Sequence, residues 1–169
     1  MLKDLTDWIP APMRETVLLR TFGFLKIPLL FFISPSVVEL SDNRCVVRVP
    51  LNRRTRNHLG SVYFGVLCAG ADCAGGLVAM RQIQQSGAKI DLIFKDFKAE
   101  FMKRAEGDVH FICEQGEAVK ALVRKAELSG ERENMPVDIF ATVPEKTGNE
   151  PVARFTLTLS LKNRKPAVG

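Results

Sequence analysis

The sequence has few of the residues that build metal centres and disulfide frameworks. Its 169 residues include two histidines and four cysteines, and the cysteines at positions 45, 68, 73 and 113 form no Cys-x-x-Cys pair. A zinc site is therefore not expected, and no motif suggests a cofactor. No secretory signal pattern is found either, so we expect free thiols in a reducing cytoplasm.

Nucleic-acid binding and membrane spanning also lack support. Lys and Arg outnumber Asp and Glu by 24 to 19, but the basic residues are spread out and not interleaved with aromatic ones, so no nucleic-acid partner is expected. The longest charge-free stretch near the N-terminus, residues 27–38, is too short for a bilayer and is interrupted by Pro28 and Pro35, so no transmembrane segment is expected. This region is expected to form a helix over residues 12–26, followed by an apolar segment that caps the core; the alternative is an interfacial membrane anchor.

A single charge stands out among the residues that are present. The run from Leu59 to Met80 is apolar and rich in glycine, and Asp72 is its only side chain with a full charge at neutral pH. The run predicts one buried helix. A carboxylate inside it must find partners, face a wet pocket or raise its pKa, so Asp72 is a candidate for chemistry. The structural alternative is a hydrogen bond to nearby backbone or an ion pair with a basic side chain.

Alternation of apolar and polar residues predicts strands on both sides of this helix. The first covers residues 45–51 and ends near Pro50. In residues 90–101 the apolar positions change from even to odd numbers near Lys95 and Asp96, which predicts a bulge. Further strands are expected at residues 109–113, 137–143 and 153–161, with a short helix at 117–128 and a hairpin turn at 144–151. Runs of strands favour an α+β antiparallel sheet with helices on one face.

The segment that leads into the central helix resembles a known family. Residues 57–65 read NHLGSVYFG, and Asp72 follows Gly65 by seven positions. This pattern is similar to that of hotdog-fold acyl-CoA thioesterases of the phenylacetate-pathway type, in which an asparagine, a glycine and a His-Gly-Gly triplet precede the helix and an acidic residue follows. It looks particularly like the branch that carries Tyr-Phe-Gly in place of His-Gly-Gly and an added N-terminal helical region.

The resemblance, which spans about residues 37–162, implies a fold and an assembly. The fold is α+β: a curved antiparallel sheet wrapped around a long central helix, with an extra N-terminal helix. We expect an N-terminal helical extension at residues 1–36, a hotdog domain at 37–162 and a flexible tail at 163–169. The family also implies a homodimer or a dimer of dimers, in which Asp72 of one subunit faces residues 57–65 of another.

The chemistry of thioester hydrolysis suggests roles for several of these residues. Attack on a thioester places negative charge on the carbonyl oxygen, which the backbone N–H groups of Phe64 and Gly65 at a helix N-terminus can stabilise. Asp72 lies nearly two turns further along the same helix face, so it is expected to border the same groove. It is either a general base that activates water or a nucleophile that forms an anhydride.

The remaining site candidates surround these three residues. Asn57 either orients the water or the carbonyl, or holds the loop together. Ser61 is expected to cap the helix. Candidate substrate-binding residues are Gly60, Ser61, Tyr63 and Cys68.

The predicted function is hydrolysis of an acyl thioester carried by coenzyme A or an acyl carrier. The alternative is a non-catalytic acyl- or lipid-binding module, because the phenol of Tyr63 cannot replace the acid and base chemistry of an imidazole at neutral pH. A hydratase or dehydratase is a weaker third possibility. Apolar residues of the N-terminal region either line an acyl tunnel or pack in the core: Phe22, Phe24, Leu29, Leu30, Phe31 and Phe32.

Overall fold

The computed structural model describes residues 10–164, so the outer parts of the predicted N-terminal extension and C-terminal tail lie outside it. The helices are α1 (Ala11–Lys26), α2 (Pro28–Phe32), α3 (Phe64–Ser86), α4 (Gly116–Ser129) and α5 (Pro144–Thr147). The strands are β1 (Ser36–Leu40), β2 (Cys45–Val49), β3 (Ile90–Phe101), β4 (Val109–Cys113), β5 (Arg132–Thr142) and β6 (Pro151–Asn163).

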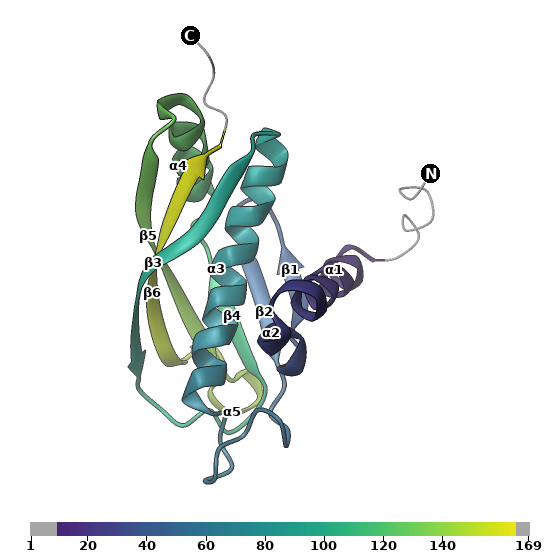
Figure 1. Cartoon of the computed structure of the whole chain (residues 1–169). Helices are drawn as coiled ribbons and strands as arrows, with labels where there is room; N and C mark the ends of the chain where they lie inside the picture. The colour runs from purple at the N-terminus through teal and green to yellow at the C-terminus, as the bar shows by residue number, and fades with distance from the viewer. Residues whose placement is uncertain (1–9, 165–169) are drawn as a thin grey trace.

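The six strands form one antiparallel sheet in the order β1-β2-β4-β5-β6-β3. The helix α3 runs lengthwise along the inner face of the curved sheet, and α1 and α2 lie beside it on one flank (Figure 1). A curved antiparallel sheet wrapped around a long helix, with an added N-terminal helix, is the α+β hotdog fold that the resemblance implied. The predicted bulge is confirmed, because the pairing of β3 with β6 shifts between Phe94 and Phe97.

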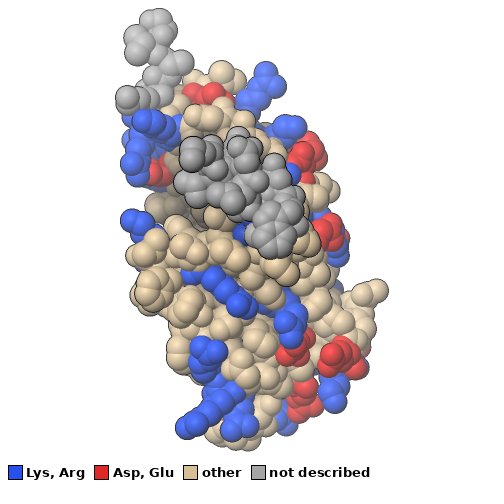
Figure 2. Space-filling view, turned by 90° about the vertical axis from the view of Figure 1, so that its right-hand side faces the viewer, with Lys and Arg blue, Asp and Glu red and all other residues tan. Residues whose placement is uncertain are grey.

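The two edges of the sheet are covered differently. The helix α1 is tied to the β1 edge, because the N–H of Val37 donates to Thr16 Oγ1 at 2.8 Å and Arg20 Nε donates to the carbonyl oxygen of Pro35 at 2.9 Å. Figure 2 looks onto this flank of the molecule. At the other edge, β3 pairs only with β6 within residues 10–164, and none of its 12 residues is buried. A long edge strand of this kind is open to pairing with another chain.

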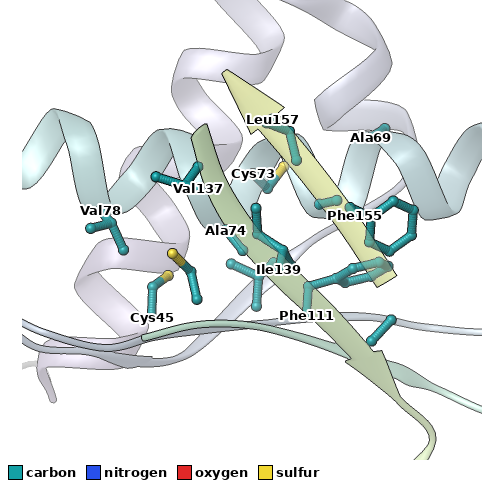
Figure 3. Close-up of a cluster of buried hydrophobic side chains, with 14 of the residues drawn as sticks. Cys45, Ala69, Cys73, Ala74, Val78, Phe111, Val137, Ile139, Phe155 and Leu157 are labelled. Carbon is teal, nitrogen blue, oxygen red and sulfur yellow. The ribbon is translucent and has the colours of Figure 1, made fainter. Parts of the chain in front are cut away.

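The central helix packs closely on the sheet because its inward face carries small side chains. Ala71 and Ala74 are fully buried, and Gly70 lies directly against the ring of Phe111. Figure 3 shows side chains buried between the helix and the sheet, with Ala69, Cys73, Ala74 and Val78 on the helix and Phe111, Val137, Ile139, Phe155 and Leu157 on the strands. Within residues 10–164, α3 is the helix with the length and apolarity of a membrane span, but 56% of its most apolar stretch is buried inside the fold.

The structure departs from the sequence-based expectations in three local features. The central helix begins at Phe64 rather than Leu59, because the N–H groups of Val62 and Tyr63 donate to loop carbonyls at 2.8 and 2.9 Å instead of joining the helix. The elements α2 and β1 were not predicted, since five residues show too little periodicity. The turn predicted at residues 144–151 includes the short helix α5.

Two alanine substitutions test the close packing of α3. A methyl group at Gly70 would lie 2.3 Å from the fully buried Phe111 ring, whereas at Gly76 it would meet no atom closer than 3.8 Å. We expect Gly70→Ala to lower the free energy of unfolding by about 1–3 kcal/mol. Gly76→Ala should raise it by up to about 1 kcal/mol through better helix propensity. Urea denaturation measures both, and equal stabilities would contradict the close approach.

Candidate functional site

The Asp72 carboxylate lies in the wall of a cavity of about 440 Å³. The cavity is bounded by α1, α2, α3 and β3, and apolar side chains form most of its wall. Asp72 is partly buried, yet within residues 10–164 no group donates a hydrogen bond to it and no basic side chain pairs with it. Its environment is therefore not that of a structural carboxylate held by backbone or by an ion pair.

Burial changes the acidity of this carboxylate. It raises the pKa of Asp72 from 3.8 to about 6, because desolvation disfavours the charged form. At neutral pH most of the carboxylate is still ionised, so it can accept a proton or attack a carbonyl carbon. A pKa close to the working pH also improves a general base.

The apolar walls of the cavity come from segments that are far apart in the sequence. The helix α1 contributes Leu19, α3 contributes Met80, and β3 contributes Leu92 and Phe94. Sequence periodicity did not assign these residues to a common cavity, since only the tertiary fold brings them together. Of the six residues expected either to line an acyl tunnel or to pack in the core, Phe22 and Leu30 line this cavity, whereas Phe24, Leu29, Phe31 and Phe32 are exposed.

Gly76 keeps the cavity open beside the carboxylate. It lies one turn after Asp72, and a Cβ atom there would be 3.9 Å from Asp72 Oδ1 and 3.8 Å from the Phe94 ring. A larger side chain at this position would therefore occupy the space between the carboxylate and β3.

The N-terminus of α3 presents two backbone donors. Tyr63 is the N-cap residue, with φ −65° and ψ 138° and no side-chain cap. Among the described residues, the N–H groups of Phe64 and Gly65 find no acceptor, whereas those of Val66 and Leu67 donate to the Tyr63 carbonyl at 2.9 and 3.1 Å. Unpaired N–H groups at the positive end of a helix dipole favour an anion or an oxyanion.

Aromatic rings surround this helix start. The rings of Tyr63 and Phe64 are 4.7 Å apart between centroids, and those of Phe64 and Phe101 are 6.2 Å apart. A Cβ atom at Gly65 would lie 2.7 Å from the Tyr63 ring, so a residue without a side chain lets the ring lie against the first turn. Tyr63 and Phe64 are 47% and 56% exposed, which leaves them free to contact a ligand or another chain.

The loop before α3 holds Asn57 and Ser61 to each other. Asn57 Oδ1 accepts hydrogen bonds from the N–H groups of Leu59 at 2.9 Å and Ser61 at 3.2 Å, and its Nδ2 donates to Ser61 Oγ at 3.1 Å. Both polar atoms of the Asn57 amide are thus engaged in hydrogen bonds within the loop. Gly60 lies in the same loop and has a left-handed backbone conformation, with φ +81°. The prediction that Ser61 caps the central helix is wrong, because its hydroxyl bonds to Asn57 and α3 has no side-chain cap.

Within one chain the carboxylate and the helix start do not share the cavity. Asp72 and Gly65 lie on the same side of α3 but are seven residues, about 10 Å, apart along the helix axis. Reacting atoms must approach to about 3–3.5 Å, so groups this far apart cannot act on one carbonyl. The other candidates also lie outside the walls around Asp72: Asn57, Gly60, Ser61, Tyr63, Phe64 and Cys68. The expected common groove is therefore not found within a single copy.

Other reactive groups are poorly placed to compete with Asp72. Burial raises the pKa of Cys45 to about 12 and raises those of Cys68 and Cys73, so little thiolate is present at neutral pH. Over the described range, no three His, Cys, Asp or Glu side chains gather as a metal ion would require. Asp72 is therefore the group best placed to act on a molecule in the cavity.

Solved structures share this fold. A protein of unknown function from Chlorobaculum tepidum matches with a TM-score of 0.78 and 13% identity over 90% of this chain and 97% of that one. A protein from Shewanella oneidensis, provisionally named a thioesterase, matches with a TM-score of 0.74 and 14% identity over 89% of this chain and 99% of that one. A thioesterase from Haemophilus influenzae matches with a TM-score of 0.62 and 14% identity over 89% of this chain and 94% of that one. At such low identities the likeness establishes the fold alone.

The family is established by a match over most of the chain. Comparison with the curated proteins finds no match. The family described as a domain of unknown function, DUF4442, matches residues 16–161, from within α1 to near the end of β6. The chain therefore belongs to the DUF4442 family.

Proposed function

We propose that this protein hydrolyses the thioester of an acyl group carried by coenzyme A or a carrier protein. The observation that carries the proposal is the Asp72 carboxylate, which has no hydrogen-bond partner within residues 10–164 and faces an apolar cavity. Burial of an unpaired charge costs free energy. Ionisable groups with perturbed pKa values in clefts are concentrated at functional sites. Apolar walls with one polar group suit an acyl chain whose reactive end lies at that group. The named activity of the Haemophilus influenzae neighbour agrees with this chemistry.

The proposal includes a second copy of the chain, as a homodimer or a dimer of dimers. Large apolar side chains along β3 are exposed, with Ile93 at 52%, Phe97 at 41% and Phe101 at 47%. Pairing of two β3 edges would satisfy their unpaired backbone groups and cover these side chains.

An antiparallel pair of β3 strands would also complete the site. Phe101, at the end of β3, contacts Phe64 at the start of α3, whereas Phe94 lies beside Gly76 and the Asp72 cavity. Antiparallel pairing places the end of one strand opposite the beginning of the other. The start of α3 in one copy would therefore approach Asp72 in the other, across the distance that separates them within one chain.

In this arrangement the N–H groups of Phe64 and Gly65 stabilise the oxyanion formed by attack on the carbonyl. With Asp72 as general base, the carboxylate takes a proton from water as the water oxygen bonds to the carbonyl carbon. The C–S bond then breaks, and the leaving thiolate takes up the proton held by Asp72, which regenerates the carboxylate. With Asp72 as nucleophile, its oxygen displaces the thiolate to form an anhydride, which water hydrolyses.

A non-catalytic acyl- or lipid-binding module is the alternative. It is favoured by the ring of Tyr63, which lies against Gly65 where the resembling enzymes carry a histidine. This alternative requires a retained acyl ligand and no release of thiol.

Thiol release from a panel of acyl-CoA thioesters tests the activity. We expect turnover to rise with pH through about 6, because both routes need ionised Asp72 and burial raises its pKa to about 6. Asp72→Asn should lower kcat/KM by about 100-fold or more, whereas Glu131→Gln, at an exposed position just before β5, should leave it unchanged. Equal rates for wild type and Asp72→Asn would remove Asp72 from the mechanism. A copurified acyl ligand with no thiol release would support the binding module.

The same substitution should stabilise the fold. Burial raises the pKa of Asp72 above its ordinary 3.8, so ionisation costs free energy in the folded state that the unfolded chain does not incur. Wild type therefore loses stability as pH rises from about 4 to above about 6. We expect Asp72→Asn to raise the free energy of unfolding by about 1–3 kcal/mol near neutral pH and by little near pH 4. Urea denaturation at both pH values measures this, and a gain that is independent of pH would contradict it.

The backbone N–H of Phe64 can be removed without disrupting the first turn of α3. Proline is tolerated at the first helical position, and the extended ψ of 138° at Tyr63 is compatible with a following proline. Phe64→Pro removes the N–H, whereas the matched control Phe64→Ala keeps it and removes the ring. We expect Phe64→Pro to lower kcat by about 100-fold relative to Phe64→Ala, as for loss of an oxyanion donor.

Mixing Phe64→Pro with Asp72→Asn then tests whether the site is shared. If Asp72 of one copy works with the helix start of another, mixed dimers contain one intact site. Random pairing in a two-fold dimer should then restore about a quarter of wild-type activity. No recovery after confirmed subunit exchange would place the whole site within one chain or remove Phe64 from it.

A further inference from the structure

Exposed apolar side chains are concentrated on the two N-terminal helices. Of the 18 large hydrophobic residues that are exposed in the described chain, nine lie between Met13 and Phe32. Five of them are on α1, one is Ile27 in the joint between the helices, and three are on α2. Phe24 and Leu25 are 64% and 66% exposed, although the same segment buries Leu19 and Leu30.

The outward face of α1 is unusual for a helix that faces water. Met13, Val17 and Phe24 fall on one side of the helix, and Leu18 and Leu25 continue the same exposed face. A helix that is apolar on its outer side as well as its inner side is normally covered on both. Within residues 10–164 no element covers this outer side.

The apolar face of α2 continues this surface. The rings of Phe24 and Phe31 meet edge to face at 5.3 Å between centroids, which joins the two helices on the outside. Phe32 extends the surface to the loop that follows β2, because the Arg54 guanidinium lies 5.8 Å from the centre of its ring. We call the exposed apolar face of α1 and α2, together with this loop, the N-terminal surface.

The charge around the N-terminal surface is mostly positive. Residues 10–35 and 50–56 carry six basic side chains and one acidic one, Glu15, which pairs with Arg14. The other basic residues are Arg20, Lys26, Arg53, Arg54 and Arg56. In Figure 2 the middle of the visible face is mainly tan with blue side chains across it, and red side chains lie toward the lower right.

We infer that the N-terminal surface docks the protein on an anionic lipid surface. Apolar side chains on a short helical segment enter the boundary between head groups and acyl chains, and surrounding Lys and Arg side chains meet the lipid phosphates. A second copy of this chain fits less well, because a two-fold contact would place the same basic residues opposite each other. Ile27 belongs both to this surface and to the wall of the Asp72 cavity, so docking holds that wall at the lipid.

Vesicle flotation of the full chain tests this inference. We use vesicles of phosphatidylcholine alone and of phosphatidylcholine mixed in equal amounts with phosphatidylglycerol. The protein should bind the anionic vesicles, and added salt should weaken binding. Arg53→Gln with Arg54→Gln should lower the partition coefficient about fivefold for each charge removed. Leu25→Gln with Leu29→Gln should lower it about tenfold for each leucine.

Matched variants on α4 serve as controls. Leu128 is 75% exposed there, and Lys120 and Arg124 are exposed bases on the same helix. Leu128→Gln, and Lys120→Gln with Arg124→Gln, should leave vesicle binding unchanged.

Binding that is absent, equal on both vesicle types, or equally weakened by the control variants would overturn the inference. A different result would show that the surface contacts another copy of the chain. In that case wild type does not bind vesicles, and Leu25→Gln with Leu29→Gln lowers the oligomeric fraction in sedimentation velocity. None of these readouts depends on thioester hydrolysis.

Discussion

The close contact between α3 and the sheet is the constraint on which the rest of this structure depends. Gly70 admits the ring of Phe111, and neighbouring alanines bring the helix axis near the strands. A helix with this many small residues has weak intrinsic stability, so packing against the sheet must hold it. The same packing fixes Asp72 at the edge of the apolar interior, where desolvation raises its pKa to about 6.

Three features of the single chain are unfavourable when taken separately. Among residues 10–164, Asp72 has no hydrogen-bond partner, the first two N–H groups of α3 have no acceptor, and β3 has no buried residue. In the proposed dimer all three have one explanation. In it the β3 edges would pair, the helix start of one copy would approach Asp72 of the other, and a thioester carbonyl would lie between them. Such an arrangement would give up stability of the isolated chain in exchange for a site that forms only in the assembly.

The N-terminal helices contribute to two surfaces at once. Their inner sides supply Leu19, Phe22 and Leu30 to the cavity, while their outer sides expose Phe24 and Leu25. Within α1, Gly23 lets α2 approach closely, because a Cβ atom there would lie 2.7 Å from the backbone nitrogen of Phe31. A change in this hairpin would therefore affect both the shape of the cavity and the surface proposed to meet lipid.

Local sequence pattern determined four features: the strands in which apolar and polar residues alternate, the bulge in β3, the central helix, and the position of Asp72 as the one charged residue in an apolar run. These features depend on residues close together in the chain, and a lone charge in an apolar run is conspicuous in any fold. Only the tertiary structure decided that β3 lies at an edge, that Asn57 is engaged by Ser61, and that Leu92 and Phe94 complete the cavity. It also decided that Asp72 and Gly65 do not meet within one chain. Strand order, loop hydrogen bonds and cavity walls arise from contacts between distant segments, which no periodicity along the chain encodes.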